Sequence, residues 1–275
     1  MIIVFSVAAF VFCYPCIFML VGSFMSSSEI QSHLAGVLGT GNNYVDWCLL
    51  PKEPSFQSYI ALLVDSPEVF TMFWNSIKII GIVLVGQICI GIPAAWGLAR
   101  YSFPFRKILF VIYIILMVMP FQVMMLAEYL VIKKIGILDT LWSIIFPGIF
   151  SAFMVFIVYV SFRKIPEEVL EAARIDGSGE WNILWKIGVP MAKEGILAAL
   201  VLSFLEYWNL IEQPMTFLQT KSKWPLSLYL SISNTEDIGL KFCVAVLALI
   251  PATLVFMIGQ KYLQNGLGTI VQEGK

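Results

Sequence analysis

The densest charged stretch of the sequence runs from Pro166 to Pro190 and reads PEEVLEAARIDGSGEWNILWKIGVP. Eleven of the chain's 35 Asp, Glu, Lys and Arg residues (18 acidic plus 17 basic) lie among the 32 positions from Arg163 to Glu194. Carboxylates and cations at this density can form ion pairs and polar contacts with a partner, but they cannot cross a bilayer. We therefore expect this stretch to lie in water.

A second set of polar residues lies inside apolar segments. Glu206, Asn209 and Gln213 are spaced i, i+3 and i+7, so a continuous helix would carry all three on one face. Gln122 follows Pro120, which is expected to break a helix. Such side chains either line a hydrophilic passage or form hydrogen bonds between neighbouring helices, and the sequence leaves both interpretations open.

The sequence has no constellation typical of catalysis or metal binding. His33 is the only histidine, no Gly-x4-Gly-Lys-Ser/Thr phosphate loop occurs, and no His and Cys cluster has metal-ligand spacing. Cys13 and Cys16 have the spacing of a redox dithiol, but they lie in an apolar run and not at an exposed helix N-terminus. No basic cluster indicates nucleic acid. We expect neither an enzyme nor a nucleic-acid-binding protein, and no catalytic residue, metal or cofactor in this chain.

The elements that must position these residues are membrane helices. The chain is 59% apolar and only 13% charged, and several apolar runs approach the roughly 20 residues that span a bilayer. These features predict an all-α polytopic membrane protein with six transmembrane helices in a single domain over residues 1–275. The expected spans cover about 2–24, 75–99, 108–130, 141–162, 195–218 and 242–262, with a long loop at 25–72 and a polar tail at 264–275.

Local signals within the charged stretch predict two short helices around a turn. Pro166 suits a first helical position and predicts that a helix starts there, and Gly177 suits the positive φ that often ends one. Ser178 is expected to cap the second helix, and Pro190 is expected to end it. Apolar residues of the second helix recur at i, i+3, i+4 and i+7 and predict one buried face, namely Trp181, Leu184, Trp185 and Gly188.

The same stretch resembles the EAA loop of the membrane permeases of ABC importers. The resemblance rests on Glu171-Ala172-Ala173, Asp176-Gly177 and Ile187-Gly188-Val189-Pro190 at the family's separations, with Val189 where the family usually has Leu. Weaker matches extend it over nearly the whole chain and are similar to the second permease of carbohydrate importers. The resemblance implies the type I ABC importer permease fold, with residues 166–190 as a cytoplasmic coupling-helix loop.

The resemblance also implies partners and a function. It assigns coupling to the ATPase to Glu171, Ala172, Ala173, Asp176, Gly177 and Pro190, and it makes Glu206, Asn209, Gln213 and Gln122 candidates for the translocation path. ATP and Mg²⁺ would be bound by two partner ATPase subunits, and the other partners would be a different sister permease in a heterodimer, an extracytoplasmic solute-binding protein and membrane lipid. The expected solute is a sugar or oligosaccharide. A polyol, a glycerophosphate or an amino acid remains an alternative.

Basic residues predict the orientation in a bacterial cytoplasmic membrane. With 166–190 inside, about ten of the 17 Lys and Arg residues fall on the cytoplasmic side and about six outside. Both termini and the 264–275 tail are then cytoplasmic, and the 25–72 loop is extracytoplasmic. An ion-coupled secondary transporter is the more distant alternative, because the sequence shows no internal duplication and we place one glutamate, Glu206, in mid-membrane.

Overall fold

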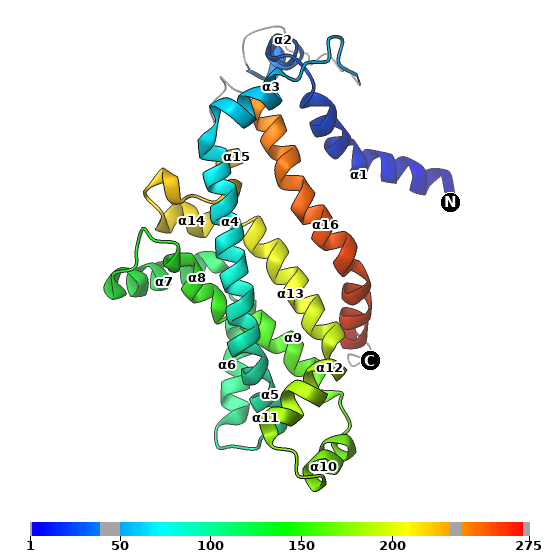
Figure 1. Ribbon diagram of the computed structural model, residues 1–275, viewed down its shortest axis with the longest axis vertical. Coiled ribbons are helices and arrows are strands. Elements are labelled where there is room, and N and C mark those ends of the chain that lie inside the picture. The colour runs from blue at the N-terminus through cyan, green and yellow to red at the C-terminus, as the bar shows by residue number, and fades with distance from the viewer. Residues whose placement is uncertain (1, 39–49, 232–237, 272–275) are drawn as a thin grey trace. The chain divides into compact units, whose positions relative to one another are not determined.

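A computed structural model describes residues 2–38, 50–231 and 238–271, and all regular elements within these ranges are helical (Figure 1). The elements in chain order are α1 Ile2–Gly22, α2 Ser27–Leu38, α3 Gln57–Ile60, η1 Ala61–Asp65, α4 Pro67–Gly86, η2 Gln87–Gly91, α5 Ile92–Arg100, α6 Arg106–Val118, α7 Phe121–Ile135, α8 Trp142–Ile149, α9 Ala152–Arg163, α10 Glu167–Ile175, α11 Glu180–Ile183, η3 Leu184–Gly188, α12 Val189–Met191, α13 Lys193–Trp208, α14 Glu212–Phe217, η4 Lys221–Lys223, α15 Leu226–Ser231 and α16 Ile238–Val271. The predicted all-α class is confirmed.

The chain divides into two compact units, residues 1–74 with 224–251 and residues 75–223 with 252–275. In the first unit, the end of α1 packs on the start of α16. The Phe18 and Phe242 rings meet edge to face at 5.6 Å, and a Cβ at Gly22 would lie 3.2 Å from the Phe242 ring. The Ser23 and Tyr59 hydroxyls lie 2.8 Å apart, so α3 is tied to the same corner.

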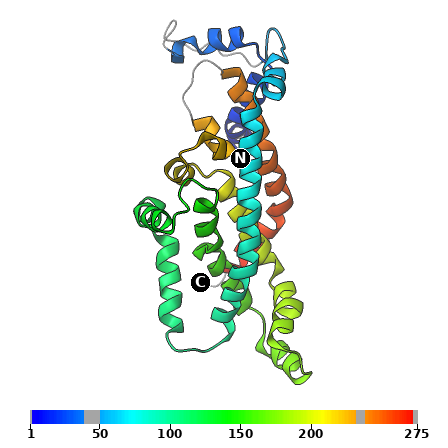
Figure 2. The same cartoon turned by 60° about the vertical axis from the view of Figure 1, so that its left-hand side comes forward.

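The core of the second unit lies between α5, α9 and α13. Their buried apolar side chains include Trp96, Phe162 and Ile196, and the Trp96 and Phe162 rings meet edge to face at 5.0 Å. Leu170 of α10 and Ile183 of α11 join the same cluster. The charged stretch is therefore fixed to the membrane helices by apolar burial, and α10 projects at the end of this unit where the turn between α5 and α6 also lies (Figures 1 and 2).

Among the residues that the structure describes, four helical segments are long and apolar enough to cross a membrane: Val4–Gly22, Pro67–Arg100, Trp142–Arg163 and Ile238–Gly266. Two bent pairs raise the number to six if each pair is one span. Arg106–Val118 and Phe121–Ile135 meet at 108°, and Glu180–Met191 and Lys193–Trp208 meet at 78°. The structure therefore accommodates the predicted six spans, although two of them are sharply bent.

Several predicted boundaries were wrong. The predicted 25–72 loop contains α2 and the start of α4 at Pro67, and its residues 39–49 lie outside the described ranges. The predicted fifth span ends at Trp208 and not at 218. The predicted tail is largely helical because α16 continues to Val271, and only residues 272–275 of the tail lie outside the described ranges.

A single carboxylate ties two loops of the second unit together. Asp139 accepts hydrogen bonds from the backbone N–H groups of Gln219 and Thr220, both at 2.9 Å, and from the Thr220 hydroxyl at 2.6 Å. Lys223 Nζ lies 3.0 Å from the same carboxylate. These hydrogen bonds, chiefly those from Thr220, hold the pKa of Asp139 well below its usual range.

We expect Asp139→Asn to lower the melting temperature of the detergent-solubilised protein at pH 7. The neutral amide loses the charge-assisted bonds, which costs about 1 kcal/mol or roughly 2–4 °C. The pKa of Asp139 is lower in the folded protein than in the unfolded chain. Its stabilisation is therefore fully present above the pKa of the unfolded chain and is lost as the pH falls through the pKa of the folded protein. The difference between the two proteins should therefore shrink only in strong acid. Asp65→Asn, at an exposed carboxylate, is the control, and an equal shift in both variants would contradict the role of Asp139.

Candidate functional site: the EAA loop and a polar set of side chains

Helix α10 lies where the charged stretch predicts the first helix, and its ends show why. Glu167 and Glu168 lie in the first turn and Arg174 lies in the last, which matches the helix dipole. Gly177 has φ +79°, its N–H bonds the Arg174 carbonyl, and the Ser178 N–H bonds the Ala173 carbonyl, both at 3.0 Å. This pair of bonds is a Schellman motif, which requires a left-handed residue at Gly177.

Two details of this turn differ from the prediction. Pro166 is the N-cap of α10 and not its first helical residue. Ser178 does not cap the next helix, because its N–H closes α10 and Gly179 takes the N-cap position of α11. The predicted positive φ of Gly177 is confirmed.

The second half of the loop does not carry the predicted apolar face. Leu184 and Gly188 are buried, but Trp181 is 66% exposed and Trp185 is 40% exposed. Trp181 lies in α11, before the π-helical turn η3, and Trp185 lies within η3, so the four residues do not follow one α-helical register. Gly188 meets the Trp96 ring, and a Cβ there would lie 2.7 Å from Trp96 Cζ3. Pro190 is exposed inside α12, and the helix ends one residue later than predicted, at Met191.

The residues assigned to coupling lie on both sides of α10. Ala173 is buried in the core beside Leu170, whereas Glu171, Ala172, Asp176 and Gly177 are exposed. Ile175 is 86% exposed at the end of the helix. One face of α10 thus anchors the helix, and the opposite face presents a carboxylate, a small residue and an isoleucine to the surroundings.

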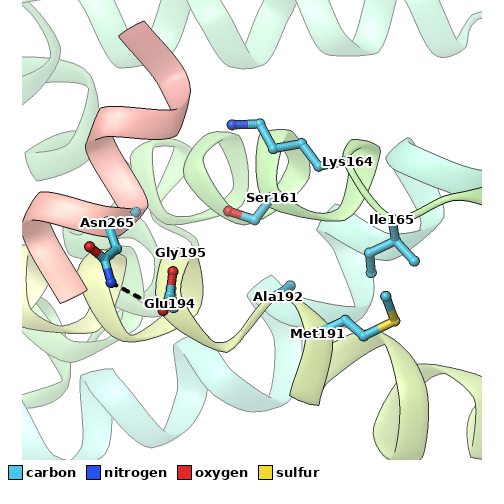
Figure 3. A pocket seen from close by; sticks show the side chains of 9 residues that line it. Ser161, Lys164, Ile165, Met191, Ala192, Glu194, Gly195 and Asn265 are labelled. Carbon is cyan, nitrogen blue, oxygen red and sulfur yellow. Dashed lines mark hydrogen bonds between the residues drawn. The ribbon is translucent and has the colours of Figure 1, made fainter. Parts of the chain in front are cut away.

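A cavity of about 150 Å³ lies beside the 78° bend between α12 and α13. Ser161, Lys164 and Met191 contribute to its lining, and Figure 3 shows Asn265 turned toward Glu194. Asn265 Nδ2 donates to Glu194 Oε1 at 3.2 Å, which fastens α16 to the start of α13. This cavity leaves free volume around the bend.

The predicted polar face on the fifth span is not formed as expected. The helix ends at Trp208, so Glu206 lies in α13, Asn209 is its C-cap and Gln213 belongs to α14. Asn209 Nδ2 donates to the Leu205 carbonyl, a local cap. The three residues therefore do not share a helical face, because a turn at 209–211 separates them.

Tertiary contacts instead bring two of the predicted residues to carboxylates that the sequence analysis missed. Gln213, which is 5% exposed, donates to Glu128 of α7 at 3.1 Å. Gln122 donates to both oxygens of Glu212 at 2.9 Å. The position of Glu128 inside an apolar run was the sequence signal for the first of these two contacts.

We call Gln122, Glu128, Glu206, Asn209, Glu212 and Gln213 the polar set. Glu206 and Asn209 come from the end of α13, and the other four residues come from α7 and α14. Gln122, Glu206, Asn209 and Glu212 are exposed on this chain. Exposed carboxylates and amides on apolar helices are costly against lipid, so they require water or another chain beside them. Among the described residues, no group of three or more His, Cys, Asp and Glu side chains could hold a metal ion.

The fold and this site define a class: a multi-pass helical membrane protein with a helix pair anchored at one end and a polar surface on its membrane helices, as in a transport subunit. Residues 87–269 match the family model of the binding-protein-dependent transport system inner membrane component. The chain belongs to this family. It is a multi-pass inner-membrane permease of the ABC importer class, which confirms the family that the EAA loop predicted.

Relatives extend over most of the chain. The arabinooligosaccharides transport system permease protein AraQ of Bacillus subtilis (strain 168) is 29% identical over 269 residues, which is 96% of this chain and 91% of AraQ. The sn-glycerol-3-phosphate transport system permease protein UgpE of Brucella abortus (strain 2308) is 31% identical over 212 residues, 71% of each chain. The structure of a bacterial ABC transporter involved in the import of the acidic polysaccharide alginate matches with a TM-score of 0.80 at 22% identity, covering 94% of both chains, and confirms the fold.

We expect Gln213→Leu to destabilise the protein more than Gln122→Leu. Both glutamines donate to a glutamate across the same two helices, but Gln213 is buried and Gln122 is exposed. Loss of the buried donor leaves Glu128 unpaired and costs about 1–3 kcal/mol, whereas Glu212 can turn to water at a cost within about 0.5 kcal/mol. Thermal melts of the two purified variants measure the difference, and equal shifts would show that burial does not distinguish the two pairs.

Proposed function

We propose that this permease imports neutral sugars or oligosaccharides in an ATP-driven, binding-protein-dependent system and supplies half of the translocation pathway. The observation that carries the proposal is the chemistry of the polar set. Its carboxylates and amides accept hydrogen bonds from hydroxyl groups and donate to ring and hydroxyl oxygens. No Lys or Arg belongs to it, so it offers no clamp for a phosphate, and its three carboxylates repel anions.

The partners follow from the family and from the exposed surfaces. The polar set needs a second chain beside it, which a sister permease in a heterodimer would supply. The outward face of α10 would dock on one of two ATPase subunits that bind ATP and Mg²⁺, with Glu171 and Asp176 making polar contacts and Gly177 keeping the turn. An extracytoplasmic binding protein would deliver the solute. The 166–190 loop and both termini would then be cytoplasmic, as the distribution of basic residues favours.

The main alternative solute is an anion. UgpE is named for sn-glycerol-3-phosphate and is 31% identical to this chain, which keeps a glycerophosphate under consideration. The polar set argues for the neutral solute, because a passage with three carboxylates and no cation raises the energy of a bound phosphate.

The test is reconstitution of the complex that copurifies with this chain, together with its binding protein, in proteoliposomes. We expect an ATPase and a second permease to copurify, and we expect ATP-dependent uptake of arabinooligosaccharides with little uptake of sn-glycerol-3-phosphate. Preferential uptake of the phosphate would replace the sugar assignment. A chain that purifies alone and moves solute without ATP would instead make the protein a secondary transporter.

Gly177→Val tests the coupling loop, with Gly179→Val as its matched control. Neither glycine has an atom within 4 Å of an added Cβ, but Gly177 has φ +79° and Gly179 has φ −68°. Valine at position 177 should raise the energy of the turn by about 1–2 kcal/mol and reduce ATPase copurification, while the protein stays in the membrane. Valine at position 179 should have little effect. Normal ATPase copurification and uptake with Gly177→Val would show that the left-handed turn is not needed for coupling.

A further inference from the structure

Five side chains link α10 to the rest of the second unit. We call Arg100, Tyr101, Glu167, Arg174 and Glu180 the coupling ring. Arg100, at the end of α5, donates from Nη1 to Glu167 Oε2 at 2.9 Å. Arg174 donates from Nη1 to the other Glu167 oxygen at 2.9 Å and from Nε to Glu180 Oε1 at 2.9 Å.

The links form a closed circuit. The Tyr101 hydroxyl donates to Glu180 Oε2 at 3.0 Å, and Tyr101 follows Arg100 in the chain. Both carboxylate oxygens of Glu167 and of Glu180 accept a hydrogen bond, and the Arg174 guanidinium donates from both Nη1 and Nε. These paired bonds hold each of the three side chains in one orientation. The ring thus joins the start of α10, the end of α10, the start of α11 and the end of α5.

The ring also includes the end of α9. Arg100 Nη2 donates to the Phe162 carbonyl and, at 2.6 Å, to the Ile165 carbonyl, so one guanidinium caps α9 and binds α10. The Arg100 side chain is only 7% exposed, whereas the other charged side chains of the ring are 35–49% exposed. Isolated exposed ion pairs contribute little, but a network with one buried, multiply bonded member holds its geometry much better.

The contacts of the ring shift the pKa values of three of its members, Glu167, Arg174 and Tyr101. The hydrogen bond from Arg174 lowers the pKa of Glu167, and the bonds to Glu167 and Glu180 raise the pKa of Arg174. Partial burial, followed by the contact with Glu180, raises the pKa of the Tyr101 phenol. Glu167 and Arg174 therefore keep the charges that their ion pair requires, and Tyr101 keeps the proton that its hydroxyl donates.

We propose that the coupling ring makes α10 move as one rigid body with the ends of α5 and α9, so that force on the outer face of α10 reaches these membrane helices. The proposal rests on the proposed role of α10 at an ATPase and names the residues that position it. Leu170 and Ala173 hold one face of α10 by packing, but apolar packing alone permits sliding and rotation. The ring adds directional bonds at both ends of the helix and removes that freedom.

The test compares Arg174→Gln with Arg163→Gln in the reconstituted importer. Arg163 is an exposed arginine at the end of α9 with no hydrogen bond or ion pair among the described contacts, so it matches the residue type and the charge lost. The readout is solute transported per ATP hydrolysed, with arabinooligosaccharides as the probe. Unfolded complexes contribute to neither quantity, so this ratio does not respond to a merely structural loss.

We expect Arg174→Gln to lower the ratio by about threefold to tenfold and Arg163→Gln to leave it unchanged. Tyr101→Phe removes one hydroxyl at the opposite side of the ring and should lower the ratio by a smaller factor in a well-folded protein. Equal ratios in the wild type, Arg174→Gln and Tyr101→Phe would overturn the role of the ring while leaving the importer function intact. Absence of ATP-driven uptake in the wild type would overturn the proposed function and this inference with it.

A distance measurement gives a readout that needs no solute. Spin labels at exposed positions 102 and 168 report the separation of α10 from the turn after α5. In the protein with the intact ring, we expect one narrow distribution of label distances that is the same in nucleotide-free and ATP-bound complexes. In Arg174→Gln, we expect a broader distribution that changes with the nucleotide. A wild-type distance that changes with nucleotide would show that α10 moves separately from α5, contrary to the proposal.

Discussion

The burial of the Arg100 guanidinium is the interaction on which the charged end of this permease depends. A cation that is only 7% exposed must recover the cost of leaving water, and Arg100 does so through two carbonyls of the α9 terminus and the Glu167 carboxylate. The Trp96 ring lies 5.7 Å from its guanidinium carbon and adds a cation–π contact. Because these partners come from α9 and α10, the burial of one side chain fixes the position of the coupling loop against two membrane helices.

Local backbone chemistry explains what the sequence predicted well. The bounds of α10 follow from acidic residues in its first turn and from the glycine that ends it, and all of these signals lie within twelve residues of one another. The same reasoning failed at Ser178 and in the second helix. A Schellman motif used the Ser178 N–H, and a π-helical turn changed the register. Both devices depend on hydrogen bonds that no hydrophobic period reveals.

The polar set shows that residue spacing predicts a shared face only as far as the helix continues. The periodicity of Glu206, Asn209 and Gln213 assumed a helix through position 213, but the helix stops at Trp208. The partners of Gln213 and Gln122 lie 85 and 90 positions away in the sequence, and the partners of Arg100 lie 62 to 67 positions away. A single sequence identifies polar residues that lipid would exclude, but the fold decides which of them meet.

Helix α13 connects the charged stretch at 166–190 with the polar set, because it begins at Lys193 and contains Glu206. Its first turn follows the bend at Ala192, where a Cβ at Gly195 would come within 1.8 Å of Ser161 Oγ on α9, and Glu206 lies about 16 Å further along the helix axis. Ala198 and Ala199 are fully buried between these points, so α13 packs closely on its neighbours through small side chains. Contiguous packing thus runs along α13 from the bend at Ala192 toward the carboxylate of Glu206, and a cavity lies beside the bend. The arrangement places the bend that follows the charged stretch and the Glu206 carboxylate on one continuous, closely packed helix.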